Sequence, residues 1–173
     1  VGVSKMALEI PAEQVWSAFT RAGFGARASA DFPGEVGGVL RNYRQWHDVE
    51  RATAAYGYGV SVTALQLVRA YAALADAGRL RPVSFTRVAD RAQIAKTGDQ
   101  VFRPELTTQL RRMLETVSQD GGTGTEARVA GYRVAGKTGT VKKSHDGGYS
   151  ERSYLAVFAG FAPVSNPRLA MVV

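Results

Sequence analysis

The chain has 173 residues, 45% of them hydrophobic and 21% charged, with a formal net charge of +7 and no cysteine. This length suits one domain with a core of its own, and the lack of cysteine excludes a disulfide framework and thiolate catalysis. Lys and Arg are scattered along the chain without a nucleic-acid-binding motif, so we expect a solvated basic surface and no nucleic-acid partner.

The first half of the chain carries two helical patterns. Residues 11–23 open with proline and keep apolar side chains on one side, which predicts a helix. The Gly- and Pro-bearing connection DFPGEVGGVL, residues 31–40, is expected to be irregular. Residues 61–78 have the clearest amphipathic period, and Gly78 is a natural C-terminal stop for that helix. The alternating segment RPVSFTRV, residues 81–88, predicts a strand.

A further helix is predicted to begin at Pro104 and to end before the glycine-rich residues 121–124. Its apolar face consists of Leu106, Leu110, Met113, Leu114 and Val117. Arg111 and Arg112 lie opposite that face, and we expect both to be solvated. The glycines are typical of a helix stop and turn, which we favour over an anion-binding cradle.

The hydrophobic period changes to two in the last third of the chain. Residues 132–137, 153–163 and 168–173 predict three successive strands, and the polar segment 141–152 predicts a loop between the first two. Strands that follow one another after several helices favour an antiparallel sheet with helices packed on it. The predicted fold class is therefore α+β.

The sequence gives no indication of a metal or another cofactor. His47 and His145 are far apart and lack the spacing of a metal-binding helix. No apolar run reaches the roughly 18 residues of a membrane span, and no signal peptide is recognisable. The chain begins at Val1 rather than Met and ends in LAMVV, inside an expected strand. We therefore expect it to be a piece of a longer protein.

Two interpretations compete for Lys137. Residues 131–138, GYRVAGKT, match the phosphate-loop pattern G-x-x-x-x-G-K-[ST]. A phosphate loop needs a glycine-rich bend followed at once by a helix, whereas Tyr, Arg, Val and Ala follow Gly131 and suit a strand. Beyond Thr138 come a glycine and the β-branched Thr140 and Val141, which cannot open a helix there. The nucleotide interpretation fails on this missing helix.

The second interpretation needs a strand, which the sequence supplies. The K-T-G-T segment, residues 137–140, matches the last of the boxes S-x-x-K, S-x-N and K-T-G of serine acyl-transfer enzymes. Lys137 would supply positive potential for a substrate carboxylate, and the Thr138 hydroxyl would donate to it. Gly139 would let a peptide lie against the strand. Thr140 would offer its N–H to an oxyanion and its hydroxyl to the carboxylate.

The three letters K-T-G are not specific alone, because they recur at Lys96, Thr97 and Gly98. This second copy is followed by Asp and Gln in a polar segment without a strand pattern. We assign it no role.

Longer motifs occur in a fixed order along essentially the whole chain: VGVSKMALEIP, DFPGE, AYGYGVSVTALQLVRAYAALADAG, GGTGT, GYRVAGKTGTVKK and YLAVFAGFAP. Together they resemble the C-terminal part of the transpeptidase domain of class B penicillin-binding proteins. The likeness is greatest to the cell-division (septal) peptidoglycan D,D-transpeptidases of Gram-negative bacteria. The resemblance implies a β-lactamase/transpeptidase-like fold, with a mainly antiparallel sheet flanked by helices.

The resemblance also implies a setting and partners. Such a protein is anchored to the bacterial inner membrane by an N-terminal segment and faces the periplasm. It cross-links peptidoglycan stem peptides that end in D-Ala-D-Ala, through a serine acyl-enzyme, and is acylated by β-lactams. Other cell-division proteins are further candidate partners, and no cofactor is implied.

Residue by residue, the resemblance carries the third catalytic box onto residues 137–140. Tyr154 matches an aromatic position that borders the β-lactam side chain, Tyr58 a tyrosine near the cleft, and Lys142 a basic position just beyond the box. For each of these three residues a purely structural role stays open as well. Tyr58 could simply pack against the long helix, Tyr154 could be an ordinary strand aromatic, and Lys142 could keep a hairpin solvated.

One departure from the family pattern is large. No serine has a lysine three residues later, and no S-x-N exists, since asparagine occurs only at Asn42 and Asn166. We therefore expect the chain, residues 1–173, to be the C-terminal portion of one transpeptidase domain whose first two boxes lie upstream. Without a nucleophile this piece is predicted to be inactive alone. The alternative is a non-catalytic penicillin-binding-like sensor or protein-interaction module.

Overall fold

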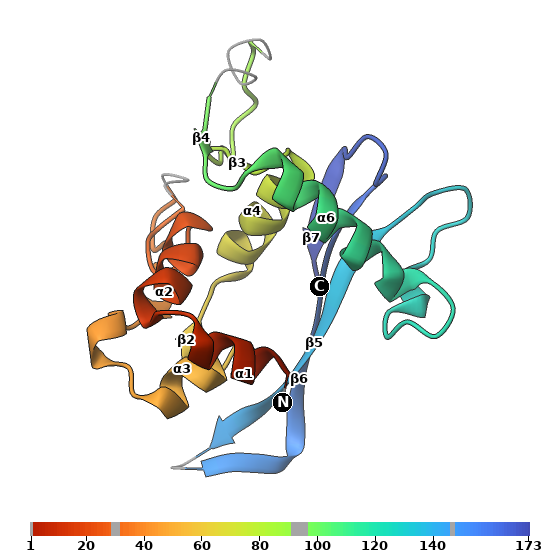
Figure 1. Cartoon of the computed structure of the whole chain (residues 1–173). Coiled ribbons are helices and arrows are strands. Elements are labelled where there is room, and N and C mark those ends of the chain that lie inside the picture. Colours follow the sequence, from red (N-terminus) through yellow and green to blue (C-terminus); the bar gives the residue numbers. More distant parts are fainter. Residues whose placement is uncertain (1, 29–31, 91–96, 146–147) are drawn as a thin grey trace.

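The computed structural model describes residues 2–28, 32–90, 97–145 and 148–173. The helices are α1 (Gly2–Glu9), α2 (Ala12–Arg21), α3 (Asp48–Ala54), α4 (Ala64–Ala75) and α6 (Pro104–Glu115), and the 3-10 turns are η1 (Tyr43–Gln45), η2 (Thr116–Ser118) and η3 (Thr125–Ala127). Figure 1 shows α1, α2 and α3 gathered on one side and the long strands on the other, with α4 and α6 next to the sheet.

The long strands form one antiparallel sheet with the order β5-β6-β7 in the described residues. These strands are β5 (Ala135–His145), β6 (Gly148–Ala162) and β7 (Leu169–Val172), and the short pairs are β1 (Val39–Leu40) with β2 (Val60–Ser61) and β3 (Arg79–Leu80) with β4 (Asp99–Gln100). Within the described part of the chain, β5 is therefore an edge strand with one side not covered by another strand. Mixed helices and an antiparallel sheet confirm the predicted fold class.

Helices α4 and α6 cover one face of this sheet. Ala135 and Phe161 of the paired strands β5 and β6, with Val164, form a buried cluster. The partly buried side chains packed against it are Tyr71, Leu74, Ala75, Leu114 and Ala170. Arg111 of α6 donates from Nη2 to the carbonyl of Val164, so the prediction of a solvated Arg111 was wrong, whereas Arg112 is exposed. The long aliphatic stem of an arginine allows its guanidinium to reach such a carbonyl from the side of a helix.

A buried glutamine joins α4 to the glycine-rich connection. Gln66 and Thr63 form a capping box, in which Gln66 N–H donates to Thr63 Oγ1 at 3.1 Å and Gln66 Oε1 accepts from Thr63 N–H at 2.8 Å. Gln66 is only 1% exposed. Its Nε2 donates to the carbonyls of Ala26 and Gly37, each at 2.7 Å. The loop before α3 is thus fastened to the helix by a satisfied buried amide.

The predicted helices are confirmed as α2, α4 and α6, with ends within a few residues of those expected. The predicted strand at 81–88 was wrong. That segment has bends and no strand, and the strand β3 that pairs with β4 ends just before it, at Leu80. Pro82 cannot donate to a ladder, and residues 84–90 are exposed, so alternation there buries nothing.

The predicted loop at 141–152 was also wrong in extent. The strands continue to His145 and resume at Gly148, with Ser144 opposite Tyr149. A polar sequence can continue a strand in this way, because the ladder is made by backbone N–H and C=O groups. The first strand begins at Ala135 rather than at residue 132.

Candidate active site

The K-T-G-T segment lies in the middle of β5, and the register with β6 is continuous there. Because side chains alternate along a strand, Lys137 and Gly139 are on the same face as the buried Ala135. Thr138 and Thr140 are on the other face. The outer side of β5 is the edge that does not pair with β6. Side chains of both faces border this edge, so a ligand lying along it can reach all four residues.

Lys137 is exposed and stays next to this outer side of the strand. Its Nζ donates to the backbone carbonyl oxygen of Thr138 at 2.6 Å. A lysine ammonium has three protons to donate, so this bond leaves donors for a further acceptor. The arrangement can attract an anionic group to the strand.

The two glycines of this strand meet different surroundings. A Cβ built on Gly136 would lie 2.5 Å from Cζ of Phe158 and 2.6 Å from the carbonyl oxygen of Ala159. A Cβ built on Gly139 would meet no heavy atom within 4 Å. Packing among the described residues therefore requires a glycine at Gly136 but not at Gly139. The space in front of Gly139 is open to a ligand.

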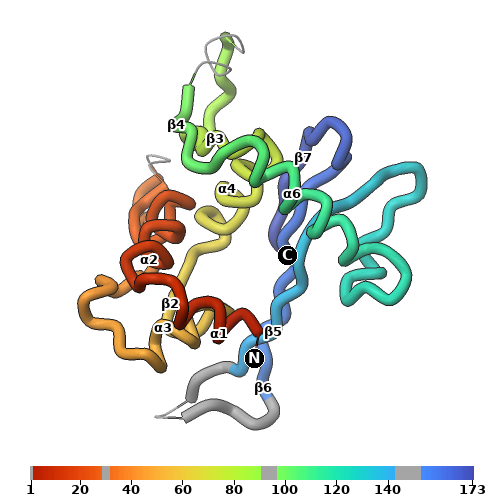
Figure 2. Tube along the Cα trace, in the orientation of Figure 1, coloured from red at the N-terminus to blue at the C-terminus, as the bar shows by residue number. Residues whose placement is uncertain are grey.

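Thr138 is half-buried and bonded to a residue outside the box. Its Oγ1 lies 2.8 Å from Oγ1 of Thr123, which belongs to the glycine-rich turn after α6. Figure 2 shows the chain leaving α6, folding into compact loops beside the sheet and returning as β5. The prediction of a turn at residues 121–124 is confirmed, but its contact with the box was missed. A threonine between glycines was the signal that could have suggested it.

Lys142 and Tyr154 lie opposite each other on β5 and β6. Paired residues of an antiparallel ladder point to the same face, which here is the face of Thr138 and Thr140. Tyr154 is 51% exposed. The structure thus brings Lys142 and Tyr154 to the same side of the sheet as the two threonine hydroxyls.

Tyr58 lies elsewhere, in the connection between α3 and β2. It is half-buried, and its ring meets that of Tyr56 edge-on, with 5.6 Å between the centroids. The contact places Tyr58 in the helical part of the molecule rather than on the strands of the box. Its role near a cleft stays a prediction.

The sequence matches the family model described as the penicillin-binding protein transpeptidase domain, over residues 1–173. The chain belongs to this family. It is 40% identical over 173 residues to the "Probable peptidoglycan D,D-transpeptidase PenA" of Neisseria meningitidis, a match that covers 100% of this chain and 29% of that protein. The "Peptidoglycan D,D-transpeptidase FtsI" of Escherichia coli is also 40% identical, with the same coverage of 100% and 29%.

A solved structure gives the same result for the fold. The apo transpeptidase domain of penicillin-binding protein 3 from Burkholderia pseudomallei superposes with a TM-score of 0.92 at 42% identity, covering 99% of this chain and 51% of that one. The resemblance drawn from the motifs and the β-lactamase/transpeptidase-like fold are confirmed. The chain spans about half of that solved domain and less than a third of the two curated relatives.

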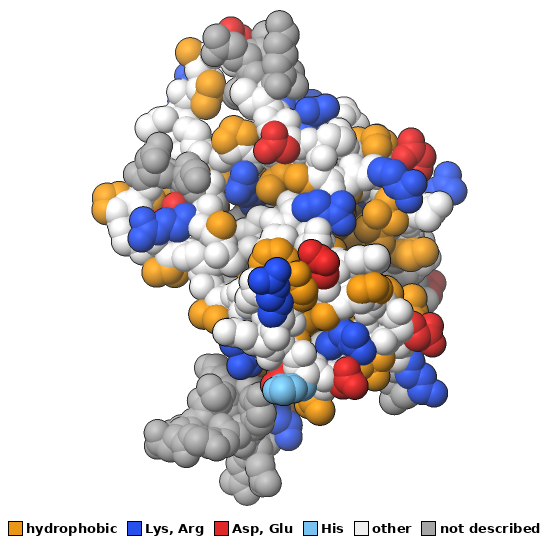
Figure 3. All heavy atoms as spheres, turned by 60° about the vertical axis from the view of Figure 1, so that its left-hand side comes forward, with side chains coloured by type: hydrophobic (Ala, Val, Ile, Leu, Met, Phe, Trp, Pro, Cys, Tyr) orange, Lys and Arg blue, Asp and Glu red, His pale blue; other side chains and the backbone are white. Residues whose placement is uncertain are grey.

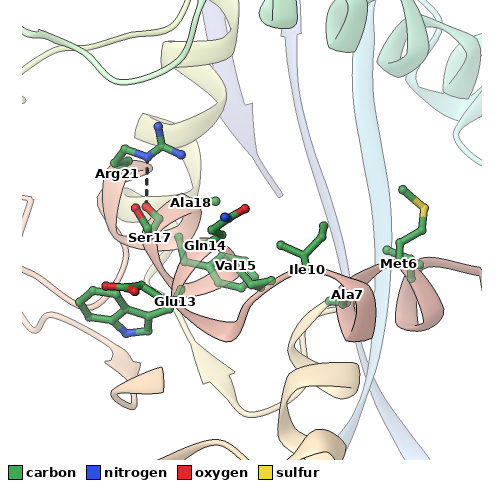
Figure 4. Close-up of a pocket in the computed structure, with 13 residues that line it drawn as sticks. Met6, Ala7, Ile10, Glu13, Gln14, Val15, Ser17, Ala18 and Arg21 are labelled. Carbon is green, nitrogen blue, oxygen red and sulfur yellow. Dashed lines mark hydrogen bonds between the residues drawn. The ribbon is translucent and has the colours of Figure 1, made fainter. Parts of the chain in front are cut away.

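One hollow of this chain has no residue of the box in its lining. It has a volume of about 820 Å³ and lies between α1 and α2. Figure 4 shows the side chains of Met6 of α1 and of Ile10, which follows that helix, projecting to the same side as Gln14 of α2, and Arg21 bonded to the carbonyl of Ser17. Its lining is mainly apolar, with Glu13, Gln14, Ser17 and Arg21 as its polar members, and it contains none of residues 137–140.

A second hollow, of about 520 Å³, is lined by α4, β3 and the start of β7. Two of its arginines are engaged with the protein itself: Arg69 Nε donates to the carbonyl of Arg81 at 2.7 Å, and Arg81 pairs with Asp76 at 2.6 Å. Burial lowers the pKa of Arg69, with Glu35 and Asp99 acting in the opposite direction. These contacts are typical of a structural network.

The surface of the chain carries charges of both signs. On the face shown in Figure 3, basic and acidic side chains are interspersed rather than gathered in one patch. No group of three or more His, Cys, Asp or Glu is placed to hold a metal ion within the described ranges. Among these residues, no helix has the length and apolar character needed to cross a bilayer.

Proposed function

We propose that this chain is part of a peptidoglycan D,D-transpeptidase that cross-links stem peptides during septal cell-wall synthesis. Family membership and 40% identity to FtsI and PenA support the reaction class. The observation that carries the proposal is the outer side of β5, where Gly139 has free space and the K-T-G-T side chains are accessible. An extended peptide can add to such a side as a further strand.

In the proposed reaction, a serine Oγ from the S-x-x-K box attacks the carbonyl carbon between the two D-alanines. The C–N bond breaks, the terminal D-Ala leaves with a proton on its nitrogen, and the peptide remains as an ester on the serine. The amine of a second stem peptide then attacks the ester, which forms the cross-link and returns the proton to the serine. A β-lactam forms the same kind of ester by opening of its ring.

The third box supports these steps electrostatically. Lys137 provides positive potential for the substrate carboxylate and bonds the serine of S-x-N. The hydroxyls of Thr138 and Thr140 donate to that carboxylate. The N–H of Thr140 is one donor to the tetrahedral oxyanion, a contribution typically worth 10²- to 10³-fold in rate. Tyr154, Lys142 and Tyr58 border the β-lactam.

The chain itself is proposed to be the C-terminal portion of one such domain, residues 1–173. The two boxes that it lacks would lie in the part of the domain that it does not span, as its 51% coverage of the Burkholderia domain allows. Alone it has no nucleophile and is expected to be inactive. The whole protein is proposed to act at the periplasmic face of the inner membrane, with other cell-division proteins as partners.

Labelling by a fluorescent penicillin tests the proposal, using this chain and a protein extended upstream through both missing boxes. Labelling of the extended protein alone is the expected result. If the extended protein is folded by circular dichroism yet is not labelled, the catalytic proposal fails. The interspersed basic surface would then favour the alternative, a penicillin-binding-like sensor or protein-interaction module.

A further inference from the structure

Thr123 lies outside the K-T-G-T box, yet its hydroxyl is bonded to that box. Oγ1 of Thr123 and Oγ1 of Thr138 are 2.8 Å apart, a normal hydrogen-bond distance between hydroxyls. Thr123 is exposed, so no buried packing demands a threonine there. Turns of this kind are usually made of Gly, Asn, Asp, Ser or Pro, and a β-branched residue is an unusual choice. The presence of a hydroxyl at this position is therefore best explained by its hydrogen bond with Thr138.

The turn is held in place on both sides of Thr123. Gly124 N–H donates to the carbonyl of Val117 at 2.9 Å, and a Cβ on Gly124 would lie 3.3 Å from both Phe158 and Val117. Gly122 N–H donates to the carbonyl of Gln119 at 2.9 Å. Both glycines allow a close approach that a larger residue would prevent, and this approach fixes where Thr123 stands.

The same connection is fastened to the start of β5. Ser118 Oγ donates to the carbonyl of Val134 at 3.0 Å. Leu114 packs on the Ala135 side of the sheet, while Thr123 reaches Thr138 on the opposite side. The chain between them must pass around the beginning of β5. The Thr123 hydroxyl is thus presented to Thr138 by a braced segment rather than by a free loop.

The proton count decides what this contact can do. A threonine hydroxyl has one proton to donate and two lone pairs to accept with. If Thr138 is to donate to a carboxylate, its proton is used there, and Thr123 must be the donor in the pair. Donation from Thr123 turns the Thr138 proton away from the turn and polarises it, which strengthens its bond to an anion.

We propose that Thr123 is a positioning residue that directs the Thr138 hydroxyl proton toward the carboxylate of the substrate or β-lactam. This inference rests on the proposed function, because it assigns Thr138 a carboxylate as partner. Thr123 extends the recognition site from β5 to the turn after α6.

The test measures acylation by a penicillin in the protein extended upstream through both missing boxes. Thr123→Val removes the hydroxyl and keeps the shape, and we expect second-order acylation to fall about threefold to tenfold, the range of one hydrogen bond. Thr123→Ser should restore the rate to within about twofold. Thr116→Val is the matched control, since Thr116 is an exposed threonine of the same connection whose hydroxyl donates to the carbonyl of Met113. It should acylate like the wild type.

Two further readouts separate positioning from structure. The methyl ester of the same penicillin lacks the anion, so Thr123→Val should slow its reaction no more than Thr116→Val does. In a Thr138→Val background, Thr123→Val should have no additional effect. Equal losses with acid and ester, additive losses in the double variant, or an unchanged rate in Thr123→Val would each overturn the inference.

The inference and the proposed function fail in different ways. Loss of acylation in Thr138→Val together with normal acylation in Thr123→Val would reject the role of Thr123 and leave the transpeptidase proposal standing. A folded, extended wild-type protein that no penicillin acylates would reject both.

Discussion

Gly136 of β5 and Phe158 of β6 are diagonal neighbours across the sheet, because Phe158 lies two residues from the residue that pairs with Gly136. Gly136 pairs with Gly160, and Phe158 pairs with Thr138, so the phenyl ring extends over both glycines. A Cβ on Gly136 would lie 2.5 Å from Cζ of this ring, and one on Gly160 would lie 2.9 Å from Cε1. The aromatic ring fills the space that two side chains would otherwise occupy, and it supports the strand just before the box.

We expect Gly136→Ala to lower the free energy of unfolding by about 1–3 kcal/mol, because the methyl group would overpack against the ring and the carbonyl of Ala159. Thermal unfolding of the extended protein measures the effect. A variant as stable as the wild type would show that the ring can move aside.

Gly139→Ala is the matched change three residues later, with the opposite expected outcome. A Cβ there meets no heavy atom within 4 Å, so stability should change by no more than about 0.5 kcal/mol. The methyl group would occupy space proposed for the peptide, and acylation by penicillin should fall about tenfold. Normal acylation by a stable Gly139→Ala variant would contradict the proposed path of the ligand along β5.

Gln66→Leu should cost about 2–4 kcal/mol of stability, because it leaves the carbonyls of Ala26 and Gly37 without the buried amide donor. Urea unfolding measures the difference. Gln109→Leu is the control, since Gln109 is exposed on α6 and should change stability by less than about 0.5 kcal/mol. Equal losses in the two variants would mean that hydrogen bonding of Gln66 is not the cause.

Local sequence patterns were sufficient to predict a helix where the segment is amphipathic and begins or ends at a recognisable residue. The helix α4 follows from its period and from Gly78, and α6 follows from Pro104. The segment 81–88 alternates equally well but has no partner strand in the part of the chain that the structure describes, and alternation predicts a strand only where one face becomes buried. The helices α1 and α3 were missed because they are short and stabilised by packing against each other.

The candidate site was predictable in part for the same reason. The motif K-T-G-T is contiguous, so its placement on one strand follows from the local pattern. Its partner Thr123 lies 15 residues from Thr138 in the sequence, and only the path of the chain around β5 brings them together. Tyr154 lies on the same face as Thr138 because it pairs with Lys142 in the ladder of β5 and β6. The sequence predicted only a loop at 141–152, so this pairing could not be predicted.

The ion pair between Glu115 and Arg133 makes stability depend on pH. The hydrogen bond from Arg133 lowers the pKa of Glu115 below its usual value of 4.5. A carboxyl whose pKa is lower in the folded state contributes stability above the unfolded-state pKa, and this contribution is lost as the pH falls through the folded-state pKa. Arg133→Gln should therefore lower the Tm at pH 7, and the difference from the wild type should shrink below the usual glutamate pKa and disappear as the pH falls through the lowered pKa of Glu115.

Arg112→Gln is the control for that measurement, because Arg112 is an exposed arginine in the last turn of α6. Its effect on Tm, if any, should not follow the titration of Glu115. A difference between Arg133→Gln and the wild type that is constant from pH 7 to strongly acid solution would exclude the ion pair as its source.

The two copies of K-T-G allow a test of the box within one protein. Lys137→Ala in the extended protein should slow acylation by penicillin at least about 100-fold, because the ammonium at the outer side of β5 would be lost. Lys96 opens the second copy and lies outside the described residues. Lys96→Ala should leave the acylation rate unchanged, since the strand after this copy is the two-residue β4, which pairs with β3 in a sheet separate from that of β5.

Both rates are measured on protein shown to be folded by its thermal transition. If Lys96→Ala abolished acylation and Lys137→Ala did not, the assignment of the box to β5 would be wrong. If neither change mattered, Lys137 would have no part in acylation, and the positive potential at the carboxylate would have to come from another residue. A selective loss in Lys137→Ala would tie the chemistry to the strand whose outer side is open at Gly139.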